Sequence, residues 1–195
     1  MKLTFKKEIN KVNLERAINI FSISFSGLFE KRIPDNLERK ALYKLILEAE
    51  DVIYAYDEKG KVVAICGVGT KENSSKAVKV KDLRKLLGFS VAVVFASFFD
   101  NRKDVKKDEL YISFLAVDKK NRRRKIGTKF LTYIASYSIE LSKTSILVDD
   151  VPSNIAGVNL FKKFGFEFSE EKETKRYKKG FGITFDKYSR YRKIL

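Results

Sequence analysis

The sequence contains no histidine, one cysteine and two prolines among its 195 residues. Without histidine, His-ligated metal sites and histidine-containing catalytic triads are excluded. The single cysteine excludes an intramolecular disulfide bond. Its apolar neighbours in VVAICGVG (62–69) predict that the Cys66 thiol is buried and unreactive. We therefore expect no metal ion and a reducing, cytoplasmic compartment.

Long apolar runs are also missing. The most apolar stretch, FSVAVVFASFF (89–99), is interrupted by serines and is too short to span a bilayer. The first residues, MKLTFKKEINKVN, lack the apolar segment of a secretory signal. No repeat, low-complexity tract or Pro/Gly-rich linker divides the chain. We expect a single domain over residues 1–195, without a membrane partner.

Positive charge is abundant instead. Lysine and arginine number 41 against 25 aspartates and glutamates, which gives a formal net charge of +16. Such an excess predicts attraction to polyanions or to anionic cofactors, and it does not identify a fold. The hydrophobic content of 44% is that of a globular protein.

Periodicity predicts a mixed α/β (α+β) chain. The expected strands are 2–6, 52–57, 62–69, 110–118, 144–150 and 166–171. A first helix is expected from the apolar residues that recur at helical spacing between Leu14 and Phe29, and the others are expected after Asp35, Lys125 and Asn154. Residues 81–99 are expected to be helical in two pieces, forming a helical insertion over 77–100. Asp35 or Asn36 is a suitable cap for the second helix, and Gly165 for ending the last one. The segment 89–99 is interpreted either as a packed insertion or as a lid over an acceptor pocket.

The most basic stretch, NRRRKIGTKFL (121–131), joins an expected strand to an expected helix. Free backbone N–H groups and the helix dipole make the start of a helix a binding site for phosphate. Gly127 removes a side chain where an anion approaches. The pattern predicts a pyrophosphate site, and the alternative is a solvated basic face.

Two blocks resemble the motifs of the GCN5-related N-acetyltransferases (the GNAT superfamily). LAVDKKNRRRKIGTKFL is similar to the signature Gln/Arg-x-x-Gly-x-Gly/Ala: Arg122 takes the first position, Lys125 replaces the first glycine, and Gly127 keeps the last. NIAGVNLFKKFGF (154–166) is similar to Asn-x-x-Ala/Gly-x-x-Leu-Tyr-x-x-x-Gly-Phe. Two motifs in order, separated by one helix and one strand, are a specific signal.

The resemblance implies a mixed, mostly antiparallel sheet with a splayed central strand pair and helices on both faces. It implies that acetyl-CoA is the co-substrate, and that its acetyl group passes to a primary amine by direct attack in a ternary complex. The cofactor-binding residues that it implies are Leu115, Ala116 and Val117 on the central strand, Arg122, Arg123, Arg124, Lys125, Ile126, Gly127 and Thr128 in the basic connection, and Asn154 and Phe161 in the second motif. Asn154 has the alternative role of a helix N-cap.

The catalytic residues are less well marked. Family members often carry a tyrosine at the position of Phe161, whose phenol protonates the departing thiolate, and phenylalanine has no proton to give. For the general base we select Tyr111, with Ser113, Glu109 and Asp149 as the other candidates, directly or through water. For each of them the alternative is a structural hydrogen bond or a surface charge.

Two other functions stay open at this point. One is nucleic-acid binding on a GNAT-like scaffold, motivated by the net charge and by the basic, aromatic-rich tail 172–195. The other is a non-catalytic CoA-binding module, motivated by Phe161. We favour interpreting the end of the tail as a closing strand, with Tyr191 and Ile194 near the core. The acceptor, and the choice between monomer and homodimer, are not determined by the sequence.

Overall fold

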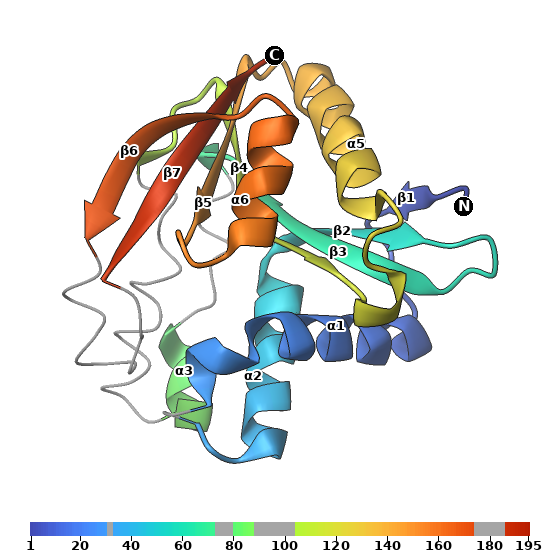
Figure 1. Ribbon diagram of the computed structural model, residues 1–195. Coiled ribbons are helices and arrows are strands. Elements are labelled where there is room, and N and C mark those ends of the chain that lie inside the picture. Colours follow the sequence, from blue (N-terminus) through green and yellow to red (C-terminus); the bar gives the residue numbers. More distant parts are fainter. Residues whose placement is uncertain (31–32, 73–79, 88–103, 174–185) are drawn as a thin grey trace.

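The computed structural model describes residues 1–30, 33–72, 80–87, 104–173 and 186–195 (Figure 1). Its elements are β1 (Thr4–Lys6), α1 (Lys11–Phe29), α2 (Asn36–Ala49), β2 (Asp51–Tyr56), β3 (Val62–Gly69), α3 (Val80–Leu87), β4 (Glu109–Val117), a 3-10 turn (Lys119–Asn121), α5 (Ile126–Glu140), β5 (Ser145–Asp150), α6 (Ile155–Lys163), β6 (Glu167–Glu173) and β7 (Lys187–Ile194). The predicted alternation of strands and helices in the second half is confirmed.

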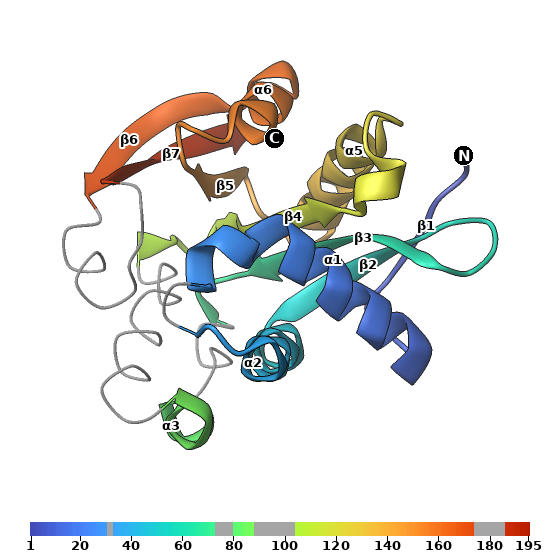
Figure 2. The ribbon, with the colours of Figure 1, turned by 60° about the horizontal axis from the view of Figure 1, so that its bottom comes forward.

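The strands form one seven-stranded sheet in the order β1-β2-β3-β4-β5-β7-β6. β4 and β5 run parallel, and every other neighbouring pair in this order is antiparallel. Helices α1 and α2 lie on one face of the sheet, and α5 and α6 on the other (Figure 2). The predicted class, a mixed and mostly antiparallel sheet with helices on both faces, is confirmed.

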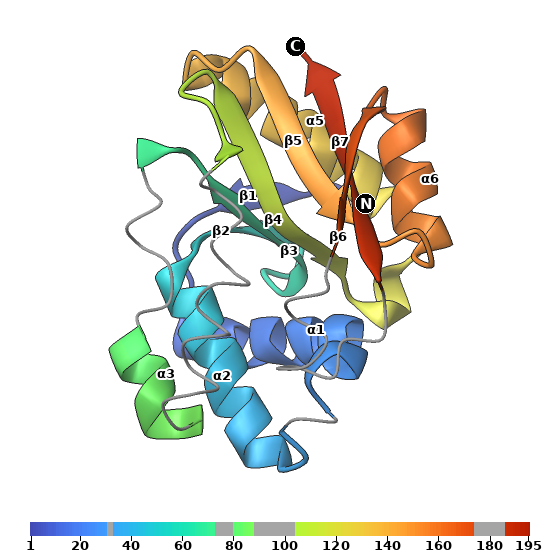
Figure 3. The ribbon, with the colours of Figure 1, turned by 90° about the vertical axis from the view of Figure 1, so that its left-hand side faces the viewer.

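The two central strands separate part-way along their length. β4 pairs with β5 from Glu109, opposite Ser145, to Ile112, opposite Val148. β4 then continues to Val117 with a partner on its β3 side. The second half of β4 therefore has an edge that β5 does not cover, as expected for a splayed central pair (Figure 3).

A bulge in β4 lies where the strands begin to separate. Gly67 of β3 is opposite Phe114 and Val68 is opposite Ile112, so Ser113 is an extra residue in the ladder. The bulge shifts the alternation of side chains. Ile112 packs into the cluster on the α5 face, whereas Phe114, two residues later, packs with α1 and α2.

The core has one layer on each face of the sheet. Phe21 and Tyr43 belong to the layer under α1 and α2, and Phe130 and Ile134 to the layer under α5. β3 is buried along its whole length because it has both layers against it. Cys66 lies within this strand and burial raises the pKa of its thiol, so the predicted inert cysteine is confirmed.

The predicted helix ends at Asp35 and Gly165 and the predicted closing strand of the tail can be compared with the structure. Asp35 caps α2, where its side chain accepts a hydrogen bond of 2.8 Å from the Glu38 N–H, and Gly165 ends α6 with φ at 89°. The tail forms β7 as a closing strand, in which Tyr191 is buried. The placement of Ile194 near the core is wrong: its side chain is 69% exposed, because it lies at the last position of the strand.

Of the expected helical insertion over 77–100, residues 80–87 form α3. Its expected second piece and the candidate lid 89–99 lie outside the described residues. None of the described helices has the length and apolar character needed to cross a membrane.

Candidate functional site

A cavity of about 1110 Å³ opens along the gap between β4 and β5. Side chains from α1, α5 and α6 close it together with the two strands. Among the predicted cofactor-binding residues, those that line it are Leu115, Ala116, Val117, Arg122, Arg123, Lys125, Ile126, Gly127, Thr128 and Asn154. Tyr111 lines it too. Arg124 and Phe161 are not among the described residues that line the cavity.

The open edge of β4 has a defined polarity. The Asp118 N–H donates to the Val63 carbonyl at 2.9 Å, so the Val117 carbonyl in the same peptide points away from β3. Because successive residues of a strand direct their backbone groups to opposite sides, Leu115 and Val117 present N–H and C=O to the gap. Phe114 and Ala116 direct theirs to β3. An extended ligand in the gap can therefore pair with β4 as an added strand does.

The basic connection is a tight turn of unusual backbone. Arg123 and Lys125 have φ values of 64° and 59°, and α5 starts at Ile126 without a side-chain cap on its first N–H groups. Each left-handed non-glycine residue costs about 1–2 kcal/mol. This conformation explains why the related motif has glycine at the position of Lys125. Arg122, Arg123 and Lys125 of this turn line the cavity together with the start of α5, whose first amides have no side-chain cap, and this arrangement suits a pyrophosphate.

Arg122 is fixed by two contacts. Its Nε donates to the Val117 carbonyl at 3.2 Å and an Nη donates to Ser24 Oγ of α1 at 3.4 Å. The guanidinium therefore lies at the end of the open β4 edge. Arg124, two residues on, is exposed and donates to Asn121 at 3.5 Å, outside the cavity lining.

Gly127 has a packing role in addition to the expected anion approach. A Cβ at this position would lie 2.8 Å from Leu160 Cδ2 of α6. The start of α5 thus contacts the second motif directly. The two sequence motifs, separated by a helix and a strand in the chain, meet across this cavity.

Asn154 is the N-cap of α6. Its Oδ1 accepts from the Gly157 N–H at 3.2 Å, and its Nδ2 donates to both carboxylate oxygens of Asp150 at 3.0 Å. The N-cap prediction is confirmed, while a contact with the cofactor stays a prediction. Burial raises the pKa of Asp150 to about 6, and the Asn154 and Val151 hydrogen bonds act in the opposite direction.

Phe161 is placed differently from the expected contact with the cofactor. Its side chain is 5% exposed and its ring meets Phe166 edge-on, with centroids 5.5 Å apart. The ring belongs to the core beneath α6 because it points inward from the helix. Its neighbour Leu160 lines the cavity instead.

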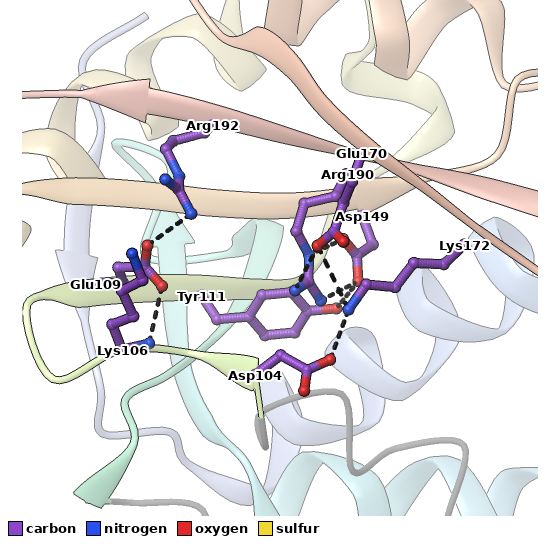
Figure 4. A network of polar contacts seen from close by, with 9 residues as sticks. All are labelled: Asp104, Lys106, Glu109, Tyr111, Asp149, Glu170, Lys172, Arg190 and Arg192. Atoms are coloured by element: carbon purple, nitrogen blue, oxygen red, sulfur yellow. Dashed lines mark hydrogen bonds and ion pairs between the residues drawn. The ribbon is translucent and has the colours of Figure 1, made fainter.

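Tyr111 is part of a polar network on the sheet (Figure 4). Its hydroxyl donates to Asp149 Oδ2 at 3.1 Å, and Arg190 donates to Asp149 from Nε and Nη2 at 2.8 and 2.9 Å. Burial, and then the Asp149 charge, raise the pKa of Tyr111 well above its usual value. These contacts argue against the expected base role, because a buried phenol beside a carboxylate keeps its proton.

The other expected bases differ in what they contact. Glu109 is 2% exposed, pairs with Arg192 at 2.9 Å and accepts from the Lys106 N–H at 2.8 Å (Figure 4). Asp149 is held by Arg190 and Tyr111. Ser113 does line the cavity, and its hydroxyl donates to Glu50 Oε2 at 3.0 Å. Among the described residues, no group of acidic, cysteine or histidine side chains is suited to hold a metal ion.

The comparisons with known proteins agree with this geometry. The family model described as "Acetyltransferase (GNAT) family" matches residues 14–166. The chain belongs to the GNAT acetyltransferase family. Membership implies N-acetyltransferase activity in general, and the family typically uses acetyl-CoA. No curated protein matches the GNAT chain in sequence.

Solved GNAT structures resemble it over nearly their whole length. Ard1 from Thermoplasma volcanium has a TM-score of 0.61 at 15% identity, covering 99% of this chain and 97% of that one. A GNAT acetyltransferase from Streptococcus pneumoniae has a TM-score of 0.57 at 14% sequence identity, and the match covers 100% of this chain and 99% of that one. The ribosomal-protein-S18-alanine N-acetyltransferase from Escherichia coli has a TM-score of 0.56 at 14% sequence identity, and the match covers 100% of this chain and 94% of that one. At such identities the likeness is one of fold.

Sequence reasoning missed two carboxylates in the cavity of this GNAT protein. Glu50 follows the last turn of α2 and Asp150 ends β5, and both line the cavity. Asp150 could have been found, because Asp and Asn four residues apart across the VPSN turn are suited to a local contact. Glu50 carries no comparable signal, since its contact with Ser113 joins residues 63 positions apart.

Proposed function

We propose that the chain transfers the acetyl group of acetyl-CoA to a primary amine by direct attack in a ternary complex. The observation that carries the proposal is the open β4 edge at Leu115 and Val117, which ends at the basic turn before α5. An extended ligand that carries a pyrophosphate fits both parts of this site. Its arm pairs with the β4 edge by backbone hydrogen bonds, and its pyrophosphate binds the basic turn by charge.

Each part of the site has a proposed task. The first amides of α5, with Arg122, Arg123 and Lys125, bind the pyrophosphate. The Leu115 and Val117 backbone pairs with the pantetheine arm. The bulge at Ser113 brings the thioester carbonyl beside the carboxylate of Glu50, which is 7% exposed and accepts the proton released by the attacking ammonium. Positioning and electrostatics supply most of the acceleration.

Phe161 has no proton for the departing thiolate, so the proposal includes no acid from α6. A thiol with a pKa near 8.5 is a tolerable leaving group near neutral pH. Thiolate release without that acid reduces the rate by at most about 10²–10⁴-fold relative to enzymes that have one. A cytoplasmic location, a single domain over residues 1–195, and a monomer or homodimer stay predictions.

The experiment is calorimetric titration of acetyl-CoA into wild type, Arg122→Ala and Arg124→Ala. The two variants lose the same charge from the same basic run, but Arg122 lines the cavity and Arg124 does not. We expect wild-type binding in the micromolar range, weakened about tenfold or more by Arg122→Ala, a change of about 1.4 kcal/mol. Arg124→Ala should weaken it less than about threefold.

The absence of wild-type binding would end the acyltransferase proposal and leave nucleic acid as the anion to test. Equal weakening by both variants would show diffuse attraction to a basic face in place of a built site. Binding without acetylation of any amine would favour the non-catalytic CoA-binding alternative.

A further inference from the structure

Asp150 lies across the gap from the part of β4 that receives the thioester. The last paired residues of the two strands are Ile112 and Val148. Continued two residues further, this register places Asp150 across from the segment between Ser113 and Leu115. In the proposed function the pantetheine arm pairs with Leu115 and the thioester carbonyl reaches Ser113. The sulfur atom, which joins the arm to the carbonyl, therefore belongs beside Asp150, a residue of the cavity wall.

The Asp150 side chain reaches the gap from the α6 face of the sheet. Because side chains alternate along β5, it shares the face of Val148, which packs in the cluster under α5. Its contact with Asn154, the N-cap of α6, lies on that face too. Glu50 follows α2, which covers the other face (Figure 2). The proposed base and Asp150 therefore approach the cavity from opposite faces.

The two carboxyl oxygens of Asp150 have different surroundings. Oδ1 accepts from the Val151 N–H at 2.8 Å and from Asn154 Nδ2 at 3.0 Å, whereas Oδ2 has only the Asn154 contact, at 3.0 Å, within the described parts of the chain. Oδ2 adjoins α6 at Gly157, where a Cβ would lie 2.3 Å away, so no side chain of residue 157 covers it. Both hydrogen-bond partners are neutral, and burial raises the pKa of Asp150 to about 6. The carboxyl thus takes up a proton more readily than an exposed aspartate, and Oδ2 is the oxygen with room to hold it.

The position of Phe161 leaves the departing thiolate without a proton donor from α6. Its ring is buried edge-on against Phe166. Gly157 lies four residues earlier on the same face of the helix, and Asp150 Oδ2 lies beside Gly157. The Asp150 carboxyl is therefore one helical turn from the position at which related enzymes often carry the tyrosine that protonates the thiolate.

We propose that Asp150 is the general acid of the reaction, and that its Oδ2 proton passes to the coenzyme A sulfur as the C–S bond breaks. This rests on the proposed function and adds to it the residue that protonates the leaving group. With a pKa of about 6, about one Asp150 carboxyl in ten holds its proton at pH 7, and transfer to a thiolate whose conjugate thiol has a pKa near 8.5 is favourable. General acid catalysis of this kind typically contributes about 10²–10⁴-fold.

Protons and electrons balance in this scheme. Glu50 takes one proton from the ammonium, and the nitrogen lone pair attacks the thioester carbonyl carbon, forming the C–N bond. When the tetrahedral intermediate collapses, the C–S electron pair goes to sulfur, sulfur takes the Asp150 proton, and nitrogen loses its second proton to water. Glu50 then returns its proton to solvent and Asp150 takes one up. The products are an N-substituted acetamide and the coenzyme A thiol, with one proton released overall.

The test exchanges the sulfur of the donor for selenium. A selenol is a much stronger acid than a thiol, so a selenolate leaves without taking up a proton. We measure kcat with acetyl-CoA and with its selenoester analogue, using the amine that wild type acetylates fastest from a panel of primary amines. Asp150→Asn should lower kcat at least about tenfold with the thioester and less than about threefold with the selenoester. Equal losses with both donors would show that Asp150 only holds Asn154 in place, and no loss with either would also overturn the proposal.

Tyr188→Phe is the matched control. Tyr188 lines the same cavity and precedes Ser189, the residue of β7 that pairs with Asp150. Its phenol is another proton-bearing group, and its removal should change kcat with the two donors by the same factor. A loss confined to the thioester in Tyr188→Phe, and not in Asp150→Asn, would make the phenol the acid and overturn the proposal.

If Asp150→Asn does not fold, wild type alone decides. The ratio of kcat with the thioester to kcat with the selenoester should fall at least about tenfold between pH 5 and pH 8, because Asp150 loses its proton in this range. Ionisation of the base and of the amine affects both donors alike and cancels in the ratio. A constant ratio overturns the proposal. Acetyl-CoA binding with no acetylation of any amine overturns the proposed function itself, and this inference with it.

Discussion

The side-chain amide of Asn154 donates to both carboxylate oxygens of Asp150, at 3.0 Å each, across the turn that joins β5 to α6. The same asparagine caps the helix through the Gly157 N–H. One side chain therefore fixes the start of α6 and the last carboxylate of β5, on the wall of the cavity.

Gly157 is required by this pair. A Cβ at this position would lie 2.3 Å from Asp150 Oδ2 and 2.4 Å from Asn154 Nδ2. Gly157→Ala should lower the free energy of unfolding by about 1–3 kcal/mol, measured by urea denaturation. Gly27→Ala is the matched control, because Gly27 is helical and, among the described parts of the chain, no atom lies within 4 Å of its Cβ position. It should raise stability by up to about 1 kcal/mol. Equal effects of the two substitutions would contradict the packing described for Gly157.

Asp150 predicts a pH dependence of stability. Its folded pKa is raised to about 6, above the ordinary value near 3.9. Below pH 4 the Asp150 carboxyl is protonated in both the folded and the unfolded protein, and its contribution to the free energy of unfolding is complete. This contribution is lost as the pH rises through 6, because the unfolded protein then releases the proton more readily than the folded one. The loss is about 2–3 kcal/mol in wild type and absent in Asp150→Asn. Chemical denaturation at pH 4, 5, 6 and 7 measures it, and parallel curves for the two proteins would refute the raised pKa.

The Asp149–Arg190 pair is a structural charge pair. Both side chains are buried, with 7% and 3% of their side-chain surfaces exposed. Asp149→Ala should cost about 3–5 kcal/mol of unfolding free energy, because it leaves a buried guanidinium without its main partner. Glu170 also pairs with Arg190, at 3.3 Å between Oε1 and Nη1, but its side chain is 47% exposed. Glu170→Ala should therefore lower the free energy of unfolding by less than about 1 kcal/mol. A loss below about 1 kcal/mol for Asp149→Ala would show that Arg190 is solvated.

Tyr111 separates a structural role from a catalytic one. Tyr111→Phe removes the hydroxyl that donates to Asp149 and leaves both Arg190 hydrogen bonds in place. We expect the free energy of unfolding to fall by about 1 kcal/mol and kcat to change by less than about tenfold. A fall in kcat of about 10²-fold or more, with the fold intact by circular dichroism, would restore Tyr111 as a catalytic group.

The sequence predicted what local patterns determine. The strand–turn–helix at 110–141, the basic turn, the Asn154 cap and the Gly165 helix end all depend on residues close together in the chain. Lys125 stands where the related motif has glycine, and the structure shows the consequence: a positive φ of 59° at a residue that has a side chain.

The residues that were missed or misplaced depend on tertiary contacts. LYISFLAV looks like an unbroken strand, so the bulge at Ser113 has no signal in it, although the bulge sets which side chains face α1 and α2. Phe161 belongs to a helical face whose inward direction depends on the partner Phe166. Glu50 acquires its place in the site from a strand 63 residues away.

Residue-resolved amide hydrogen exchange, measured by NMR with and without acetyl-CoA, tests directly whether the cofactor pairs with the open edge of β4. Leu115 and Val117 direct their N–H groups to the gap between β4 and β5, whereas Phe114 and Ala116 direct theirs to β3 and serve as internal controls. Acetyl-CoA should slow exchange at Leu115 and Val117 by about tenfold or more and leave Phe114 and Ala116 much less changed. Equal protection along the strand, or none, would contradict the claim that the open edge of β4 pairs with the cofactor.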